Sequence, residues 1–198
     1  MASTNDSSHD LQFENTNAWG TRQLVTMALM CAIGVILSFI EIPLFPAAPY
    51  LKYDPSAITA MVSGFAYGPG PGVAVGVVCA IIHSLIMSDF WGALMTILVI
   101  IGFVVPAALI YRTMHSFKGA LLGLAASVVA AVVLAIVGNL LITPLYSGVP
   151  VEAVMAMIVP ILTPFNLIKG LLNAVLTLVV YKSVSNLLTP RKKQVRGR

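Results

Sequence analysis

The sequence predicts an all-α membrane protein with six transmembrane helices and both termini in the cytoplasm. Three observations support this fold class. Of the 198 residues, 59% are hydrophobic and only 9% are charged, whereas a soluble domain carries about 25% charged residues. The apolar residues form runs of the length that crosses a bilayer, roughly 20 residues. With six spans assumed, almost all Lys and Arg residues fall on one side of the membrane.

Five apolar runs are long enough to cross the hydrocarbon on their own, and they cover residues 24–42, 73–87, 91–111, 120–142 and 161–181. A shorter run at residues 57–67 is followed by GPGPG at residues 68–72, which predicts a turn. We therefore expect a short sixth helix that turns back. A further amphipathic segment at residues 151–159 is expected to lie along the outer surface before the last span.

The distribution of charge gives the orientation, because Lys and Arg are enriched on the cytoplasmic side. With six spans, the inner side receives Arg22, Arg112, Lys118, Lys182, Arg191, Lys192, Lys193, Arg196 and Arg198. The outer side receives Lys52 and the acids Glu41, Asp54, Asp89 and Glu152. A five-span topology would place either Arg112 and Lys118 or the basic C-terminus on the wrong side.

The chain is expected to contain a single folded unit. Residues 1–20 are expected to form a disordered cytoplasmic tail, residues 21–184 the six-helix transmembrane domain, and residues 185–198 a basic cytoplasmic tail. Because basic residues next to a span contact anionic lipid, we interpret this tail as a membrane-surface segment and not as a nucleic-acid-binding arm.

Lys169 is the unusual residue of the last span. A Lys at a helix centre costs about 2.5 to 3.5 kcal/mol on translocon-type scales, so its side chain should face protein or water and not lipid. Asn166 precedes it by three positions and Asn173 follows by four, so all three share one helical face. Lys169 lies five residues past Pro164, roughly 7.5 Å deep at 1.5 Å per residue.

The preceding span contributes Asn139 at a similar depth. Pro144 and Pro164 are expected to close the two helix ends and to leave the segment between them irregular. Two carboxamides and one ammonium group then meet in the outer half of the bundle. Carboxamides carry a donor and an acceptor side by side, so they match the edge of an imide or pyrimidine-type ring. The alternative is that these side chains bond only to one another and to Glu41 and hold the bundle together.

The loop EIPLFPAAPYLKYDPSAI at residues 41–58 is the second unusual segment. Four prolines make it stiff, and Phe45, Tyr50 and Tyr53 give it flat apolar faces. We expect it to cover the cavity as an aromatic lid. The alternative is an interfacial aromatic belt.

The sequence lacks the residue patterns of a metal site and of an enzyme active site. His9, His83 and His115 are scattered along the chain without carboxylate or Cys partners, so neither a metal site nor a cofactor is expected. No catalytic arrangement is apparent, so we expect no enzyme. On the first span, Ala28 and Ala32 form a small-xxx-small pair that lets another helix approach closely. Such pairs are common in membrane helices, and taken alone this one is better explained by internal packing.

Five pieces of the sequence together resemble the substrate-binding S components of energy-coupling-factor (ECF) vitamin transporters, and within them the riboflavin-specific members. The pieces are YLKYDPSAI, SGFAYGPGPG, VVPAALIYR, GNLLITPLY and VPILTPFNLIKGLLNAVLTLVVYK. Their order and spacing cover residues 22 to 184, and the last piece is the most specific.

The resemblance implies a six-helix protein of the cell membrane that binds riboflavin from outside as cargo. A transmembrane coupling protein and two ATPase subunits would be its partners. Asn139, Asn166 and Lys169 match positions that hold the flavin ring, and residues 44–54 match the lid. By this resemblance the candidate site comprises Asn139, Asn166, Lys169, Tyr50, Leu51, Lys52, Thr96 and Asn173, with Ala28 and Ala32 docking on the coupling protein. Thr96 and Ile97 stand where the family pattern has an Asn-aromatic pair.

Three alternatives remain at this point. The chain is an S component for another heterocyclic vitamin, a self-contained secondary carrier, or a scaffold without transport activity. A secondary carrier usually has repeated halves and coupling-ion groups in its core, and neither is visible in the sequence. The chain has no GxxxxGK[ST] motif either, so a transporter of this sequence would take its energy from a partner.

Overall fold

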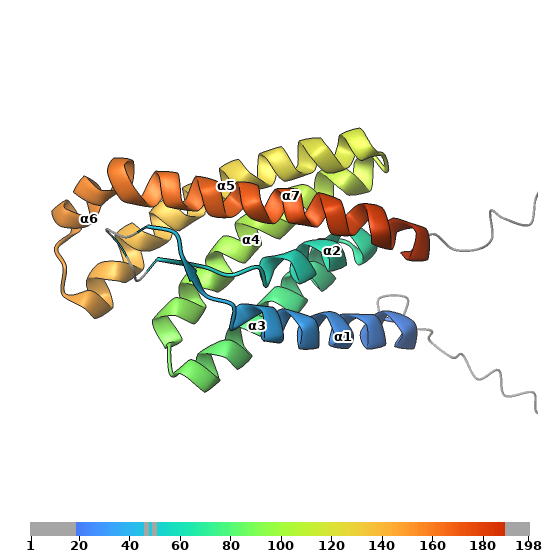
Figure 1. Ribbon diagram of the computed structural model, residues 1–198, viewed down its shortest axis with the longest axis horizontal. Coiled ribbons are helices and arrows are strands. Elements are labelled where there is room, and N and C mark those ends of the chain that lie inside the picture. Colours follow the sequence, from blue (N-terminus) through green and yellow to red (C-terminus); the bar gives the residue numbers. More distant parts are fainter. Residues whose placement is uncertain (1–18, 46–47, 49–50, 189–198) are drawn as a thin grey trace, which may run out of the picture.

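The computed structural model describes residues 19–45, 48 and 51–188, with side chains as far as residue 181, and shows a bundle of helices (Figure 1). The long helices are α1 (Thr21–Ser38), α3 (Pro69–Met87), α4 (Phe90–Thr113), α5 (Phe117–Ser147) and α7 (Thr163–Leu188), and the short ones are α2 (Ala57–Tyr67) and α6 (Val151–Met157). A π-helical turn, Ile158–Leu162, joins α6 to α7. Strands β1 (Ile42–Pro43) and β2 (Lys52–Tyr53) pair antiparallel as a small hairpin, which the prediction of an all-α protein did not include.

The bundle has two distinct ends. Figure 1 shows the start of α1 and the end of α7 together at one end, which we call the terminal end, and the hairpin and α6 toward the opposite end, the hairpin end. Among the described residues, α1, α3, α4, α5 and the segment Val151–Tyr181 are long and apolar enough to cross a membrane. These segments correspond to the long runs predicted from the sequence.

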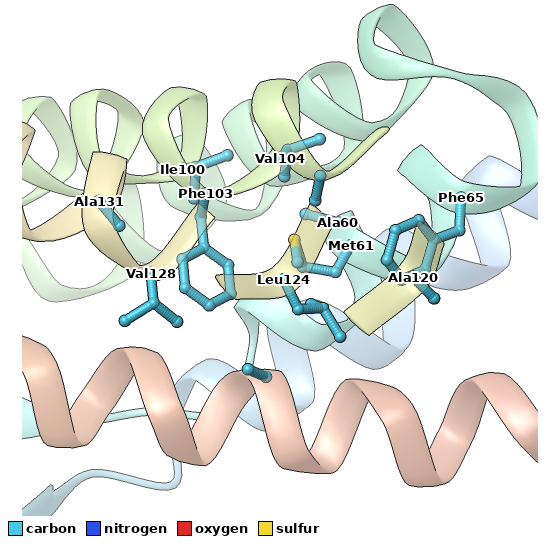
Figure 2. Packing of buried hydrophobic residues seen from close by; sticks show 12 residues of the cluster. Ala60, Met61, Phe65, Ile100, Phe103, Val104, Ala120, Leu124, Val128 and Ala131 are labelled. Carbon is cyan, nitrogen blue, oxygen red and sulfur yellow. The ribbon is translucent and has the colours of Figure 1, made fainter. Parts of the chain in front are cut away.

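Helix α2 is short and lies inside the bundle. Its 11 residues span about 16 Å, against the roughly 30 Å of hydrocarbon. Residues 58–65 are all buried, because α2 packs against α1, α3, α4 and α7. Figure 2 shows Met61 of α2 beside Leu124 of α5 and near Phe103 of α4, within the main apolar cluster. Because α2 is buried in this way, the extended chain that leads into it is surrounded by protein and not by lipid. Its backbone polar groups can find hydrogen-bond partners there.

The predicted turn at residues 68–72 is shorter than expected. Only Gly68 leaves the helical path, with φ +97°, and Pro69 already begins α3. Pro is well suited to the first helical turn, where its missing N–H has no partner to lose. Gly72 then lies against α2, where a Cβ atom would come 2.7 Å from the Cα of Gly64.

Several predicted helix ends are wrong. The first span ends at Ser38 and not at residue 42, since the chain turns into the hairpin. Pro144 lies inside α5, which ends at Ser147 before the left-handed Gly148. Helix α7 continues past residue 181, the predicted end of the last span, to Leu188.

The segment between Pro144 and Pro164 is mostly helical, where an irregular chain was expected. Pro164 has no N–H to donate to the carbonyl of Pro160, and the hydrogen bonding shifts to a wider spacing. Thr163 N–H donates to the carbonyl of Ile158, five residues earlier. Helix α6, the π-helical turn and α7 thus follow one another without a break.

Candidate ligand-binding site

A cavity of about 440 Å³ lies at the hairpin end, between α3, α4, α5 and α7 and beneath the hairpin. Its volume is in the range of sites for small organic ligands, roughly 300 to 1,000 Å³. The apolar part of its wall includes Val99, Ile100, Val154, Leu162 and Phe165. Polar side chains are set into this wall at a few points, which is the usual composition of a specific small-molecule site.

Asn139, Asn166 and Lys169 all line this cavity, as their common depth and face predicted. Asn139 Nδ2 donates to the carbonyl of Ala135 at 2.8 Å, and Asn166 Nδ2 donates to that of Leu162 at 2.8 Å. Within the described residues the two carboxamides bond neither to each other nor to Lys169. Each NH2 group has a second hydrogen, so both amides retain hydrogen-bonding capacity for a ligand.

Lys169 is paired with Asp54, a partner that the sequence analysis did not identify. The ammonium group donates to Asp54 Oδ2 at 2.9 Å, and both side chains are 22% exposed. Ser56 occupies the other carboxylate oxygen, through its backbone N–H at 3.2 Å and through its hydroxyl. Burial alone would raise the pKa of Asp54, but the charge of Lys169 and the Ser56 hydrogen bonds outweigh burial and lower it. The D-P-S spacing, in which an Asp side chain bonds to the residue two positions on, was the available local signal.

A second ion pair lies at the other side of the cavity. Lys52 of β2 pairs with Glu41, and His83 Nε2 lies 3.7 Å from the second carboxylate oxygen of Glu41. All three residues line the cavity. Glu41 was one of the expected partners of Lys169, whereas in the structure it pairs with Lys52.

Two consecutive residues, Tyr53 and Asp54, attach the hairpin segment to α7. Tyr53 is buried, and its hydroxyl donates to Asn173 Oδ1 at 3.2 Å. Burial, followed by the nearby charge of Asp54, raises the pKa of Tyr53. Asn173 therefore does not line the cavity with Asn166 and Lys169 but binds the hairpin. Phe45 adds an aromatic contact to Phe165, with ring centres 6.2 Å apart.

The other predicted site residues fall in different places. Leu51, Lys52 and Thr96 line the cavity, and Tyr50 lies outside the described residues. Sequence reasoning missed Tyr146, which lines the cavity and stacks on Trp91 at 5.8 Å between ring centres. It also missed His83 and Asp89 in the wall. Among the residues that the structure describes, no three His, Cys, Asp or Glu side chains lie close enough together to hold a metal ion.

Ala28 and Ala32 are both exposed on α1. The buried face of this helix is formed instead by Met27, Gly34 and Ser38. The alternative of internal packing is therefore not what the structure shows, and the pair lies on a surface that another helix can reach.

Comparisons with known proteins agree with this architecture. The family model for the substrate-specific component of ECF transporters matches residues 22–181. The chain is 30% identical to riboflavin transporter RibU of Staphylococcus aureus (strain TCH60), over 87% of this chain and 95% of that protein. It is 26% identical to riboflavin transporter FmnP of Bacillus subtilis (strain 168), over 81% of this chain and 90% of that one.

A solved structure gives the same result for the fold. The S component of a bacterial ECF transporter superposes with a TM-score of 0.75 at 27% identity, covering 85% of this chain and 98% of that one. The resemblance drawn from the sequence is thereby confirmed, and with it a place in the cell membrane as a multi-pass protein. The chain belongs to the family of substrate-specific components of ECF transporters.

Proposed function

We propose that this S component binds riboflavin at the outer face of the membrane and delivers it to a partner module for uptake. The observation that carries the proposal is the cavity in which Asn139, Asn166 and Lys169 meet beneath the hairpin. The names of the two relatives, both riboflavin transporters, support the same ligand.

The chemistry of the cavity suits a flavin ring. One edge of that ring alternates carbonyl groups with an imide N–H, which carboxamides complement with their adjacent donor and acceptor. Lys169 supplies a further donor to a ring carbonyl. Phe165 and Ile100 offer apolar contact to the faces of a flat ring. In this proposal riboflavin is cargo, and the protein needs no cofactor.

The membrane topology is inferred from the positions of the helices and of the basic residues at their ends. We infer six membrane passes, of which the one formed by α2 is too short to be counted by length. Arg22, Arg112 and Lys118 lie at helix ends that form the terminal end of the bundle. Because such residues favour the cytoplasmic side, both termini are assigned to the cytoplasm and the cavity to the outside.

The partners are assigned by family analogy. We propose that a transmembrane coupling protein docks on Ala28 and Ala32 of α1 and that two ATPase subunits drive release of the vitamin. Anionic lipid would contact the basic residues beyond α7.

Titration with riboflavin tests the proposed identity of the ligand and the residues that bind it. The purified protein, stripped of bound ligand, should quench riboflavin fluorescence on binding. Asn166→Ala and Lys169→Ala should each weaken binding at least tenfold, which is about 1.4 kcal/mol and within the range of a hydrogen bond to a charged or amide group.

Leu171→Ala is the matched control, because this side chain lies on α7 but is 50% exposed and does not line the cavity. Its affinity should equal that of the wild type. Absence of flavin binding after stripping and refilling would contradict the proposal and leave another heterocyclic vitamin as the ligand. Uptake into vesicles that contain no ATPase would contradict the proposed partners and favour a secondary carrier.

A further inference from the structure

Both lysines in the described part of the cavity wall have a carboxylate partner before any ligand enters. The titratable side chains in its wall, taken over the described residues, are Glu41, Lys52, Asp54, His83, Asp89 and Lys169, besides Tyr146 and the thiol of Cys79. Both of these lysines are paired, Lys52 with Glu41 and Lys169 with Asp54. Asp89 caps α4 by accepting the N–H of Gly92 at 2.8 Å. Among its described residues, the cavity therefore offers a ligand no unpaired lysine.

The carboxylate of Asp54 is held in place independently of Lys169. Ser56 binds its Oδ1 atom through both its backbone N–H and its hydroxyl. Only Oδ2 contacts the ammonium group. Asp54 thus brings a fixed negative charge to a Lys that lies 115 residues away in the chain.

We propose that Asp54 determines the charge preference of the binding site, because it neutralises Lys169 and turns this ammonium group into a hydrogen-bond donor for an uncharged ring edge. The inference rests on the proposed function, since it concerns the ring edge that faces Asn166 and Lys169. An ammonium group has three N–H donors, of which Asp54 uses one, so donors remain for a neutral carbonyl. An anionic atom at the same place would be repelled by the nearby carboxylate.

The protonation of bound riboflavin reports this charge balance directly. Removal of the imide proton changes the absorption spectrum of the flavin, so its pKa in the bound state can be followed during an alkaline titration. Asp54→Asn leaves Lys169 unpaired. It should lower the imide pKa of the bound flavin by at least one unit, which is a tenfold increase in the acid dissociation constant of the imide group. The double variant Asp54→Asn with Lys169→Gln should reverse most of this shift.

Two control variants separate charge from loosening of the loop. Glu152→Gln removes one negative charge from the exposed first turn of α6, outside the cavity wall. Tyr53→Phe removes the hydrogen bond to Asn173 but keeps Asp54. Neither should change the imide pKa of the bound flavin by more than a few tenths of a unit. Equal pKa values in Asp54→Asn and the wild type, or an equal decrease in Tyr53→Phe, would overturn the inference.

A second measurement does not depend on flavin. A deprotonated amine attacks the acyl carbon of an acetylating reagent, and an ammonium group paired with a carboxylate is protected because it keeps its proton. In the ligand-free protein, Asp54→Asn should accelerate acetylation of Lys169 at least threefold relative to the wild type, as measured by peptide mass spectrometry. Tyr53→Phe should not. Equal rates in Asp54→Asn and the wild type would overturn the role of Asp54, whereas failure of the wild type to bind flavin would refute the proposed function alone.

Discussion

At the scale of single residues, the pair of Asp54 and Lys169 connects the loop before α2 to the last helix. The 2.9 Å contact explains how a Lys is accommodated in a membrane-spanning helix, since its charge faces a carboxylate and not lipid. The hydrogen bonds from Ser56 hold the carboxylate in the orientation that Lys169 needs. Removal of either charge would leave the other partly buried and unpaired, which costs stability.

This pair gives a stability effect with a defined pH dependence. The pKa of Asp54 is lowered in the folded state, so the folded protein binds fewer protons here than the unfolded chain. The stabilisation is complete above the ordinary carboxyl range and is lost as the pH falls through the folded-state pKa. At neutral pH, Asp54→Asn should be less stable than the wild type by about 1 to 3 kcal/mol, measured by thermal unfolding in detergent. The difference should shrink below pH 4, and a difference of equal size at pH 3 and pH 7 would contradict the prediction.

At the scale of helices, close packing between α2 and α3 keeps the short helix in the bundle core. Apolar side chains are as well solvated by lipid as by protein, so membrane helices associate through close packing and hydrogen bonds. Gly64 and Gly72 face each other across this contact, with Val104 of α4 beside them. The two glycines bring the backbones together at the place where α2 turns into α3.

A pair of glycine substitutions tests this packing. A Cβ atom at Gly72 would lie 2.7 Å from both Gly64 Cα and a methyl of Val104, whereas one at Gly70 would meet nothing within 4 Å. Gly72→Ala should therefore destabilise the protein by about 1 to 3 kcal/mol. Gly70→Ala, in the same turn of α3, should be neutral or slightly stabilising. Thermal unfolding of both variants checks the prediction, which equal stabilities would refute.

The arrangement of helices was largely predictable from the sequence, whereas their ends were not. Each long apolar run became a helix because a helix satisfies the backbone groups of a membrane segment within that segment. The residues after Ser38 are as apolar as the helix itself, so composition did not reveal that the chain leaves it for a hairpin. The end predicted at Pro144 was too early, because a Pro within the last turn of a helix does not have to end that helix.

The candidate site was predicted to the extent that helical geometry determines it. Asn166 and Lys169 share a face of one helix, and Asn139 was placed by depth alone. Asp54 was missed because its contact with Lys169 joins positions 115 residues apart, and a single sequence carries no signal for such a pairing. Asn173 shares the helical face of Lys169, but the structure directs it to Tyr53.

At the scale of the whole molecule, the cavity and the proposed docking surface do not share residues. Ala28 and Ala32 are exposed residues near the middle of α1, and neither lines the cavity, which α1 reaches only at Ser38. Ligand binding and partner docking should therefore be separable by substitution.

Enlarging the small side chains tests this separation. Ala28→Leu combined with Ala32→Leu should reduce co-purification with the coupling protein at least fivefold, because a close helix contact needs small residues. Riboflavin affinity should stay within a factor of two. Ala125→Leu, at an exposed position of α5, is the control for added bulk in lipid and should assemble normally. Loss of flavin binding together with loss of assembly would contradict the separation.

The two ion pairs of the cavity also bear on the electrical side of transport. Moving one elementary charge through a membrane potential of 100 mV involves about 2.3 kcal/mol. An uncharged vitamin brings no net charge into that field, and because both lysines already have counter-charges, no anion has to enter with it. The voltage across the cell membrane then neither helps nor hinders capture, and a depolarised cell retains the same access to the vitamin as an energised one.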